Sequence, residues 1–246
     1  MPLKEMIVPP ELAGKSTSEA LRILFPDLPE SVIRRILASR DGKADNIRLA
    51  CAKMDGLVIH PGEVFSFWRL VGKTSEANGF KDGRVIVNGR LTSGMGGGLC
   101  NLANTLNLMV LHSPMAIVEF HTHSDALSPD AGQRVPLSAG TSVSYNYIDY
   151  RFKNTTGQDI QLSLWVDGET LFCELRSETA FPYRYAIVEE GHHFRKEGDH
   201  YYRVSKIYRT VSDCKTGQVL GKELIWDNHS QVMFDPELIP KELIRA

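Results

Sequence analysis

Residues 94–104 read Gly94-Met95-Gly96-Gly97-Gly98-Leu99-Cys100-Asn101-Leu102-Ala103-Asn104. The three consecutive glycines permit backbone conformations that are closed to residues with a Cβ atom. Apolar residues then follow on nearly every side of a helix until Ser113-Pro114 ends it; they are Leu99, Leu102, Ala103, Leu106, Met109 and Val110. A helix that is apolar all round is buried. We therefore expect a central buried helix over residues about 99–112.

Cys100 is the residue of this stretch that carries chemistry. At the head of a helix, a thiol meets unpaired backbone N–H groups and the positive end of the helix dipole, and both favour the thiolate. Cys100 is therefore a candidate nucleophile. In the alternative interpretation, Gly96, Gly97 and Gly98 permit two backbone segments to cross closely, and Cys100 is a small residue buried at a tight helix entry.

The chain before this stretch changes from helical to β-type patterns. Residues 16–37 predict a helical hairpin, and Asp45 is placed to cap a third helix that ends at Gly56. Residues 57–68 contain β-rich runs, and Asn88-Gly89 is typical of a tight β-hairpin turn.

The chain after the central helix returns to β-type patterns. Residues 117–123 predict a strand on which Glu119, His121 and His123 share one face, because strand side chains alternate. The polar stretch 124–139 then predicts a long loop of the kind that is often functional.

A β-meander is expected next. Its first strand, residues 143–152, would place Tyr145, Tyr147 and Asp149 on one face. Further β-like runs continue to Phe234 and predict an extension of the same sheet.

These patterns together predict an α+β fold, in which N-terminal helices are followed by a mainly antiparallel sheet packed on the central helix. We expect an N-terminal helical segment over residues 1–44 and one larger domain over residues 45–246. Residues 176–184, which contain Pro182, are a candidate internal seam.

The composition limits the partners. The chain has 246 residues, of which 42% are hydrophobic and 24% charged, and its net charge of -2 implies neither nucleic acid nor an anionic membrane surface as partner. No apolar run reaches the roughly 18 to 20 residues of a membrane span. The N-terminus has no features of a secretory signal, so we expect a cytoplasmic location unless an export signal has been removed.

The four dispersed cysteines fit reduced thiols, with Cys51 and Cys173 as small buried hydrophobes. No cofactor is expected.

A cysteine hydrolase or acyltransferase acting on a peptide or amide bond is the first functional hypothesis. Such an enzyme needs a thiolate, a base, a group that orients the base, and donors for the oxyanion. Cys100 would be the nucleophile and His121 or His123 the base. The acids that would orient the base are Glu119, Asp125, Asp130 and Asp149.

Two other kinds of site fit the same region. In a zinc-dependent hydrolase, His121 and His123 would bind the metal, and Cys100 with Asp125 or Glu119 would complete the set. A non-catalytic module would instead bind a small-molecule, sugar or peptide ligand over aromatic rings, with an arginine on a carboxylate. The residues expected to line such a site are Gly96, Gly97, Gly98, Asn101, Trp68, Tyr145, Tyr147 and Arg151, with Trp165, Arg69 and Arg84 as further candidates.

Several motifs occur in an order that resembles the VanW family. They are His60-Pro61-Gly62-Glu63-Val64-Phe65-Ser66-Phe67-Trp68, Leu70-Val71-Gly72, Gly96-Gly97-Gly98-Leu99-Cys100, Leu111-His112-Ser113-Pro114, Tyr145-Asn146-Tyr147 with Asp149, Arg151-Phe152-Lys153-Asn154, and Glu223-Leu224-Ile225-Trp226-Asp227-Asn228-His229. Asn101 stands where the family pattern has glutamine, and Phe120 stands where a basic residue usually precedes the first histidine. The resemblance runs from about Asn46 to the end of the chain and implies a VanW-like domain over residues 45–246. It also implies an accessory role in glycopeptide resistance or peptidoglycan-precursor metabolism.

Overall fold

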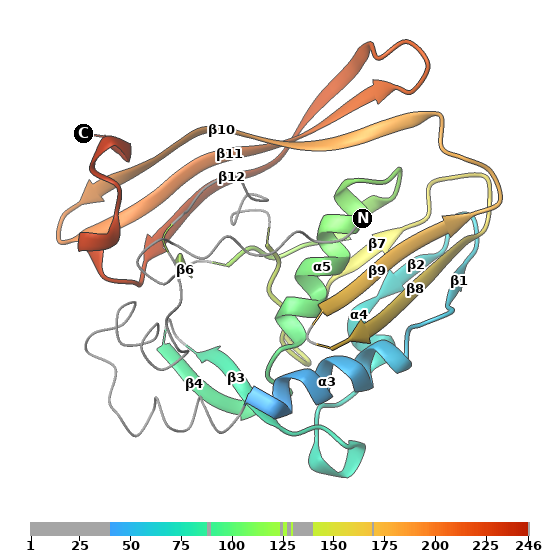
Figure 1. The fold of residues 1–246 in the computed structure, drawn as a ribbon, viewed down its shortest axis with the longest axis horizontal. Helices are drawn as coiled ribbons and strands as arrows, with labels where there is room; N and C mark the ends of the chain where they lie inside the picture. Colours follow the sequence, from blue (N-terminus) through green and yellow to red (C-terminus); the bar gives the residue numbers. More distant parts are fainter. Residues whose placement is uncertain are drawn as a thin grey trace.

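The computed structural model describes residues 40–87, 90–123, 125–126, 129, 140–168 and 170–245. The helical hairpin expected over residues 16–37 lies outside the described residues, as does most of the loop expected over residues 124–139. The described part of the protein is mostly β-sheet with few helices (Figure 1).

Three α-helices occur within the described residues: α3 (Arg40–Ala52), α4 (Phe67–Val71) and α5 (Leu99–Leu111). The earlier strands are β1 (Val58–Ile59), β2 (Val64–Ser66), β3 (Asp82–Val87), β4 (Arg90–Met95), β5 (Ala116–Glu119), β6 (Asp125–Ala126) and β7 (Arg151–Lys153). The later strands are β8 (Ile160–Asp167), β9 (Thr170–Ser177), β10 (Tyr183–Glu197), β11 (His200–Asp213), β12 (Val219–Val232) and β13 (Ile244–Arg245). Short 3-10 helices are η2 (Glu76–Asn78), η4 (Pro236–Leu238) and η5 (Lys241–Leu243).

The described strands form several separate sheets. Their orders are β1-β8-β9, β2-β7-β5, β3-β4 and β13-β10-β11-β12-β6. The pairing is antiparallel except at two short edge strands, because β13 on β10 and β6 on β12 are parallel. The prediction of mainly antiparallel pairing is therefore confirmed, whereas the packing of one sheet on a central helix is not.

Helix α5 matches the helix expected over residues about 99–112. Its side chains Leu102, Leu106 and Val110 are fully buried. They belong to one core cluster with Ile160 and Leu162 of β8. Burial of each such leucine side chain stabilises the fold by about 1.5–3 kcal/mol. In Figure 1, α5 runs between the long strand β10 and α3, beside β9.

Strands β10, β11 and β12 form a long sheet of their own, which corrects the expectation that they extend the meander. Strand β9 pairs with β8 and not with β10. Pro182 directly precedes β10, and proline has no N–H group for a ladder bond. The long sheet meets the C-terminal end of α5 through the buried pair Leu111 and Ile207, against which Ile117 and Trp226 pack.

Two helix boundaries differ from the sequence expectation because polar side chains find partners that local patterns do not reveal. Helix α3 begins at Arg40, so Asp45 lies inside it and forms an ion pair with Lys81 Nζ at 2.6 Å instead of capping the helix. The β-rich run 64–68 is interrupted by α4, because Ser66 Oγ accepts a hydrogen bond from Arg69 N at 3.2 Å and caps this short helix.

The strand expected over residues 143–152 begins only at Arg151. Before it, Ile148 N donates to Ser144 O at 2.9 Å and closes a turn. Asn146 in this turn has a φ of 65°, a left-handed conformation that asparagine tolerates better than most residues. The alternation expected for Tyr145, Tyr147 and Asp149 therefore does not occur.

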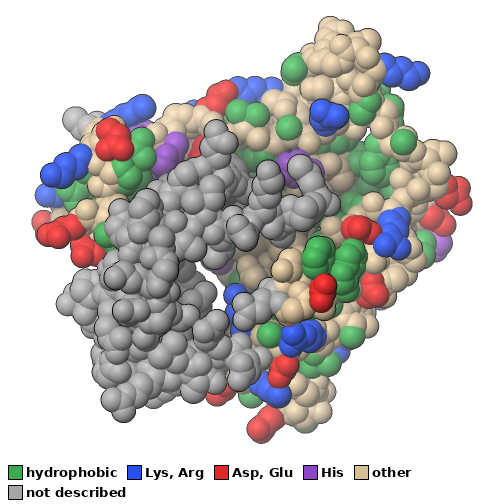
Figure 2. Space-filling model, in the orientation of Figure 1, with side chains coloured by type: hydrophobic (Ala, Val, Ile, Leu, Met, Phe, Trp, Pro, Cys, Tyr) green, Lys and Arg blue, Asp and Glu red, His purple; other side chains and the backbone are tan. Residues whose placement is uncertain are grey.

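The visible surface carries mixed charge. Figure 2 shows acidic and basic side chains interspersed over the described residues on that face. No helix in the described ranges is long and apolar enough to cross a membrane.

Two thiols lie in the main core, as expected for small hydrophobic residues. Cys51 is buried, and Cys173 packs against the same cluster with its Sγ 3.0 Å from Met109 Sδ. Burial raises the pKa of each thiol from an ordinary 9.0 to about 12.

We expect the free energy of unfolding to fall as the pH rises from about 9 toward 12. An unfolded thiol loses its proton above its ordinary pKa of 9.0, whereas Cys51 and Cys173 keep theirs until about 12 in the folded protein. The unfolded state therefore gains up to about 1.4 kcal/mol per pH unit from each thiol in this window. Urea denaturation near pH 7 and about pH 10 measures this loss. The double variant Cys51→Ala, Cys173→Ala should lose less stability over the same pH step, and an equal loss in both proteins would contradict the prediction.

Candidate functional site

The glycines before α5 allow close contact with neighbouring segments. Gly98 precedes α5 with a φ of 101°, and a Cβ atom there would lie 2.5 Å from Lys43 Cγ of α3. Gly96 has a φ of 76°, and a Cβ atom there would lie 2.8 Å from Thr74 Cγ2. Both Gly96 and Gly97 are buried. This geometry supports the interpretation that the glycines permit a close crossing of backbone segments.

Asn46 of α3 holds the glycine stretch in place through hydrogen bonds, and sequence reasoning gave this residue no role. Its Nδ2 donates to Gly97 O at 3.0 Å and to Lys81 O at 2.9 Å, and its Oδ1 accepts from Lys81 N at 2.8 Å. The side chain is fully buried. One amide therefore holds α3, the start of β3 and the entry to α5 together.

Cys100 lies in the first turn of α5 and is half-buried. Its Sγ donates a hydrogen bond to the carbonyl oxygen of Val143 at 3.5 Å. Within the described residues, neither His121 nor His123 bonds to this thiol.

Thr141 connects α5 to the segment that follows β5. Its backbone N donates to Asn104 Oδ1 at 2.5 Å. Asn104 lies one helical turn after Cys100 on α5. Its Oγ1 donates to His121 O at 3.1 Å and accepts from His121 N at 3.4 Å. The histidine segment and the cysteine helix are therefore joined through Thr141 and not by direct contact of the thiol with an imidazole.

His123 leaves the face that was expected to hold all three ionisable groups, because β5 ends at Glu119. Burial lowers the pKa of the His123 imidazole below its ordinary value, although the charge of Asp125 and a hydrogen bond with the Thr141 backbone oppose this shift. The imidazole is therefore neutral at pH 7. Its backbone carbonyl accepts from Ser230 Oγ of β12 at 3.3 Å, which turns this segment toward the long sheet.

Glu119 is the centre of a polar cluster at the end of β5. Its Oε1 accepts from His121 Nε2 at 3.1 Å and from Asp149 N at 3.0 Å. Its Oε2 lies 3.9 Å from Arg151 Nη1. The structure thus brings Glu119, His121, Asp149 and Arg151 together, while Cys100 faces Val143.

Asp149 acts as an acceptor for neighbouring backbone groups. Its Oδ1 accepts from Trp68 N at 3.0 Å and from Tyr150 N at 2.9 Å, and its Oδ2 accepts from Ser66 Oγ at 2.6 Å. Because these donors occupy both carboxylate oxygens, Asp149 positions α4 beside β7. Among the described residues, its carboxylate forms no hydrogen bond or ion pair with a histidine.

Arg151 presents its guanidinium group at the edge of this cluster. The side chain is 43% exposed. Its Nε is inaccessible to solvent and has no hydrogen-bond partner among the described residues. The long ion pair with Glu119 therefore leaves the outer N–H groups of the guanidinium available.

The aromatic residues divide into two sets. Trp68 and Tyr145 meet edge to face with ring centroids 5.5 Å apart, and Trp68 Nε1 donates to Ile148 O at 2.8 Å. Tyr147 is 86% exposed and does not join them. Asn101 is also exposed. Trp165 lies elsewhere, stacked on Phe172 with centroids 5.0 Å apart.

The described residues contain no group of three or more histidine, cysteine, aspartate or glutamate side chains placed to hold a metal ion. The zinc set suggested by the sequence is therefore not assembled among them, and Asp130 lies outside the described residues. Besides Asn46, three polar residues to which sequence reasoning gave no role shape the region, namely Ser66, Asn104 and Thr141. The spacing of Asn104 four residues after Cys100 is the one local signal that would have placed it on the same helix face.

Comparison with known proteins gives consistent matches. A family model described as VanW like protein matches residues 42–176, and so ends within β9. The vancomycin B-type resistance protein VanW of Enterococcus faecalis (strain ATCC 700802 / V583) is 28% identical over 195 residues, which cover 79% of this chain and 71% of that protein. The uncharacterized protein YoaR of Bacillus subtilis (strain 168) is 32% identical over 140 residues, which cover 57% of this chain and 45% of that protein. No solved structure matches the chain.

Proposed function

Because the chain belongs to the VanW family, we propose that it acts in glycopeptide resistance or in the handling of peptidoglycan precursors, by binding a cell-wall peptide at the cluster around Glu119. The similar protein from Enterococcus faecalis is named for vancomycin B-type resistance. In this proposal the protein recognises the carboxyl terminus of the peptide without a cysteine-dependent reaction.

The proposal rests on the partial exposure of the Arg151 guanidinium and on its long distance from Glu119. Its guanidinium is half-exposed, and the nearest carboxylate oxygen of Glu119 is 3.9 Å away, too far for a hydrogen bond. A planar guanidinium with free N–H groups can take a ligand carboxylate in a bidentate arrangement. The fixed hydrogen bonds of Glu119 and Asp149 hold the strands around it, so little order has to be gained on binding.

Trp68 and Tyr145 offer the apolar side of this site. Both rings are half-buried and in contact with each other, and the indole N–H is already satisfied by Ile148 O. A peptide bound by Arg151 would pack its small side chains against such rings.

The bond from Cys100 to Val143 favours binding over cysteine catalysis. A nucleophilic cysteine needs a base within about 3 Å. The partner of the Cys100 thiol is a backbone carbonyl, and the imidazole of His121 is held by Glu119.

A cysteine hydrolase or acyltransferase is the second candidate, and one observation favours it. Cys100 is half-buried at the head of a 13-residue helix, and Thr141 connects that helix to His121.

We expect Arg151→Gln to weaken binding of a soluble peptide with the D-Ala-D-Ala carboxyl terminus of peptidoglycan precursors by about 10- to 100-fold. The reason is the loss of a charge-assisted bond to the terminal carboxylate. Isothermal titration calorimetry measures the dissociation constant of each variant for the peptide. A matched control is Arg176→Gln, because Arg176 is an exposed strand arginine paired with Glu174 at 2.8 Å, and it should change binding less than about 2-fold.

The same titration with the peptide amidated at its carboxyl terminus tests whether Arg151 recognises the terminal carboxylate. Equal affinity for the acid and the amide would contradict recognition by Arg151. Cys100→Ala should bind the peptide as well as the unaltered protein does. Cleavage or transfer of the peptide that is detected by mass spectrometry, and that Cys100→Ala abolishes, would instead favour the cysteine enzyme.

A further inference from the structure

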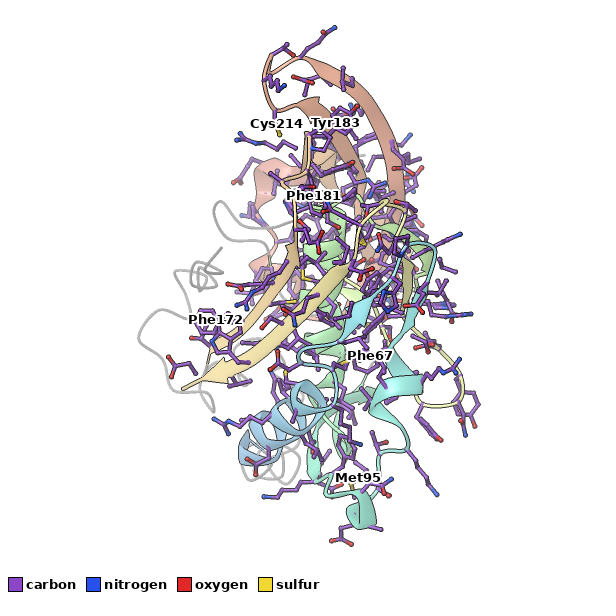
Figure 3. All side chains as sticks on the ribbon, turned by 90° about the vertical axis from the view of Figure 1, so that its right-hand side faces the viewer. Phe67, Met95, Phe172, Phe181, Tyr183 and Cys214 are labelled. Carbon is purple, nitrogen blue, oxygen red and sulfur yellow. The ribbon has the colours of Figure 1, made fainter. Side chains whose placement is uncertain are left out.

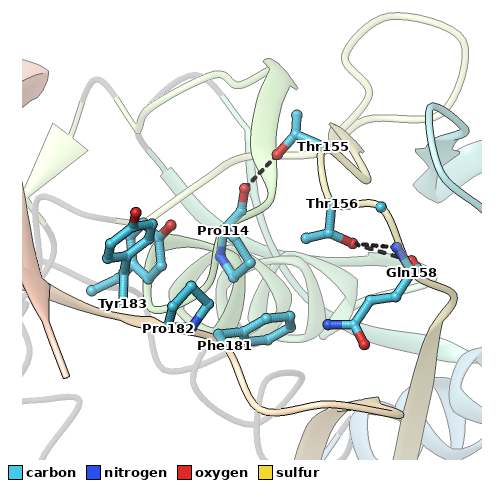
Figure 4. A pocket seen from close by; sticks show the side chains of 9 residues that line it. Pro114, Thr155, Thr156, Gln158, Phe181, Pro182 and Tyr183 are labelled. Carbon is cyan, nitrogen blue, oxygen red and sulfur yellow. Dashed lines mark hydrogen bonds between the residues drawn. The ribbon is translucent and has the colours of Figure 1, made fainter. Parts of the chain in front are cut away.

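A pocket of about 370 Å³ lies where the turn after β7 faces the start of β10. Its lining residues are Pro114, Thr155, Thr156, Gly157, Gln158, Phe181, Pro182, Tyr183 and Tyr185. Figure 4 shows Tyr183 and Pro182 on one side, Thr156 and Gln158 on the other, and Phe181 between them. The volume falls within the roughly 300–1,000 Å³ of small-molecule sites.

The polar wall of this pocket is held by hydrogen bonds. Gln158 Oε1 accepts from Thr179 N and from Thr179 Oγ1, each at 3.0 Å, and Gln158 Nε2 donates to Thr179 O at 3.1 Å. Thr155 Oγ1 donates to Pro114 O at 2.6 Å. Since these contacts join the β7–β8 turn to the segments before β10 and after α5, this wall is formed before any ligand binds.

The aromatic wall is also anchored. Phe181 packs against the main core cluster. The guanidinium of Arg209 lies over the Tyr185 ring at 5.6 Å and is itself bound to Glu223 at 2.8 Å. Tyr183, two residues earlier on the same face of β10, is 42% exposed. On this wall a ligand therefore meets Tyr185, whose ring is held by Arg209, and Tyr183, which is partly exposed.

Among the described residues, the lining contains aromatic, proline, threonine, glutamine and glycine residues and no ionisable acid or base other than tyrosine. A charged ligand would lose its hydration here without gaining a counter-charge, so the complementary ligand is neutral. Aromatic faces beside hydroxyl and amide groups suit a ring that has both apolar C–H faces and many hydroxyls. We propose that this pocket binds an uncharged saccharide of one or two rings, stacked on Tyr183.

This saccharide pocket is separate from the proposed peptide site. Pro114 and Thr155 lie beyond one end of the β5–β7 pair, whereas Glu119 and Arg151 pair at its other end. Thr155 lies four residues after Arg151, beyond the end of the three-residue strand β7. The saccharide proposal therefore goes beyond the proposed function, and either can fail without the other.

The test uses N,N′-diacetylchitobiose as the saccharide probe and a neutral proline-rich peptide as the competing chemistry, each titrated into the full chain and followed by NMR shift changes. We expect the disaccharide to bind with a dissociation constant on the order of 1 mM. Tyr183→Ala should weaken it by about 10-fold, because the variant removes the aromatic face on which the sugar ring would stack. Thermal melts check that each variant is folded.

Gly157→Phe is the second variant, because Gly157 lines the pocket and an added Cβ atom there meets no atom within 4 Å. The new ring should abolish binding without a backbone clash. The matched control is Trp165→Ala, which removes an aromatic ring that is 37% exposed and stacked on Phe172. Figure 3 shows Phe172 well away from Phe181 and Tyr183, so this control should leave the affinity within about 2-fold.

Three results would overturn the saccharide proposal. The first is no shift change with the disaccharide at millimolar concentration. The second is binding that survives both Tyr183→Ala and Gly157→Phe. The third is binding of the proline-rich peptide in place of the sugar, which would identify the pocket as a peptide groove. Unchanged behaviour of Arg151→Gln toward the disaccharide would confirm that the two sites are separate.

Discussion

Asn46→Ala is expected to lower the free energy of unfolding by about 3 kcal/mol, within a range of roughly 2–5 kcal/mol. The substitution removes three hydrogen bonds from a fully buried side chain, two of them to the carbonyl oxygens of Gly97 and Lys81. The bond to Gly97 O is buried, so this oxygen cannot turn to water when it loses Asn46, whereas Lys81 O keeps a hydrogen bond from Gly96 N at 3.0 Å. For a chain of this size the loss should lower the thermal midpoint by roughly 6–12 °C in differential scanning calorimetry.

Asn78→Ala is the control for this prediction. Asn78 is exposed and its Nδ2 donates one bond to Lys73 O at 2.8 Å. Water replaces that bond, so the cost should stay below about 0.5 kcal/mol. Similar midpoints for the two variants would show that the Asn46 amide does not hold α3 against the glycine stretch.

Gly98→Ala is expected to cost about 3 kcal/mol through two independent effects. The φ of 101° disfavours a residue with a Cβ atom by roughly 1–2 kcal/mol. The added atom would also lie 2.5 Å from Lys43 Cγ and 3.2 Å from Lys43 O. Because α3 is held by Asn46, it cannot move away freely, and crowding of this kind costs roughly 1–3 kcal/mol.

Gly217→Ala separates the two effects. Gly217 has a φ of 72°, but a Cβ atom there meets no atom within 4 Å. It should therefore show the conformational cost alone. Urea midpoints at constant m-value give the comparison. If Gly98→Ala were no worse than Gly217→Ala, the close crossing of α3 and the glycine stretch would not contribute to stability.

The same contact explains how the fold presents Cys100. The glycines fit against α3 and so fix the position at which α5 begins, and the Cys100 thiol donates to the carbonyl oxygen of Val143. The glycine stretch before Cys100, which the sequence suggested as the setting of a nucleophile, therefore serves mainly to pack the start of α5 against α3. The polar cluster around Glu119 is linked to this helix through His121 and Thr141.

Local patterns predicted the elements whose apolar spacing or turn residues are self-contained. Helix α5 and the paired strands β3 and β4 on either side of residues 88–89 occur where they were expected. In each case a period of 3.6 or 2.0 residues, or a two-residue turn, carries the signal.

Local patterns failed where a side chain bonds to distant backbone. Asp149 captures the N–H groups of Trp68 and Tyr150, and such bonds compete with a strand ladder, so the expected strand over residues 143–152 starts late. Thr141 similarly holds the backbone of His121, after β5 has already ended. The alternation that would have put His123 beside Glu119 depends on a continuous strand, and the structure lacks one there.

The sequence by itself determined the family, the buried helix behind the glycines and the antiparallel β character, because ordered motifs and apolar periodicity are properties of neighbouring residues. Only the tertiary structure decided that Glu119 meets Asp149 and Arg151 while Cys100 meets a carbonyl oxygen. The physical reason is that these contacts join segments tens of residues apart. Their geometry follows from how α3, the glycine stretch and β7 pack, which no local period encodes.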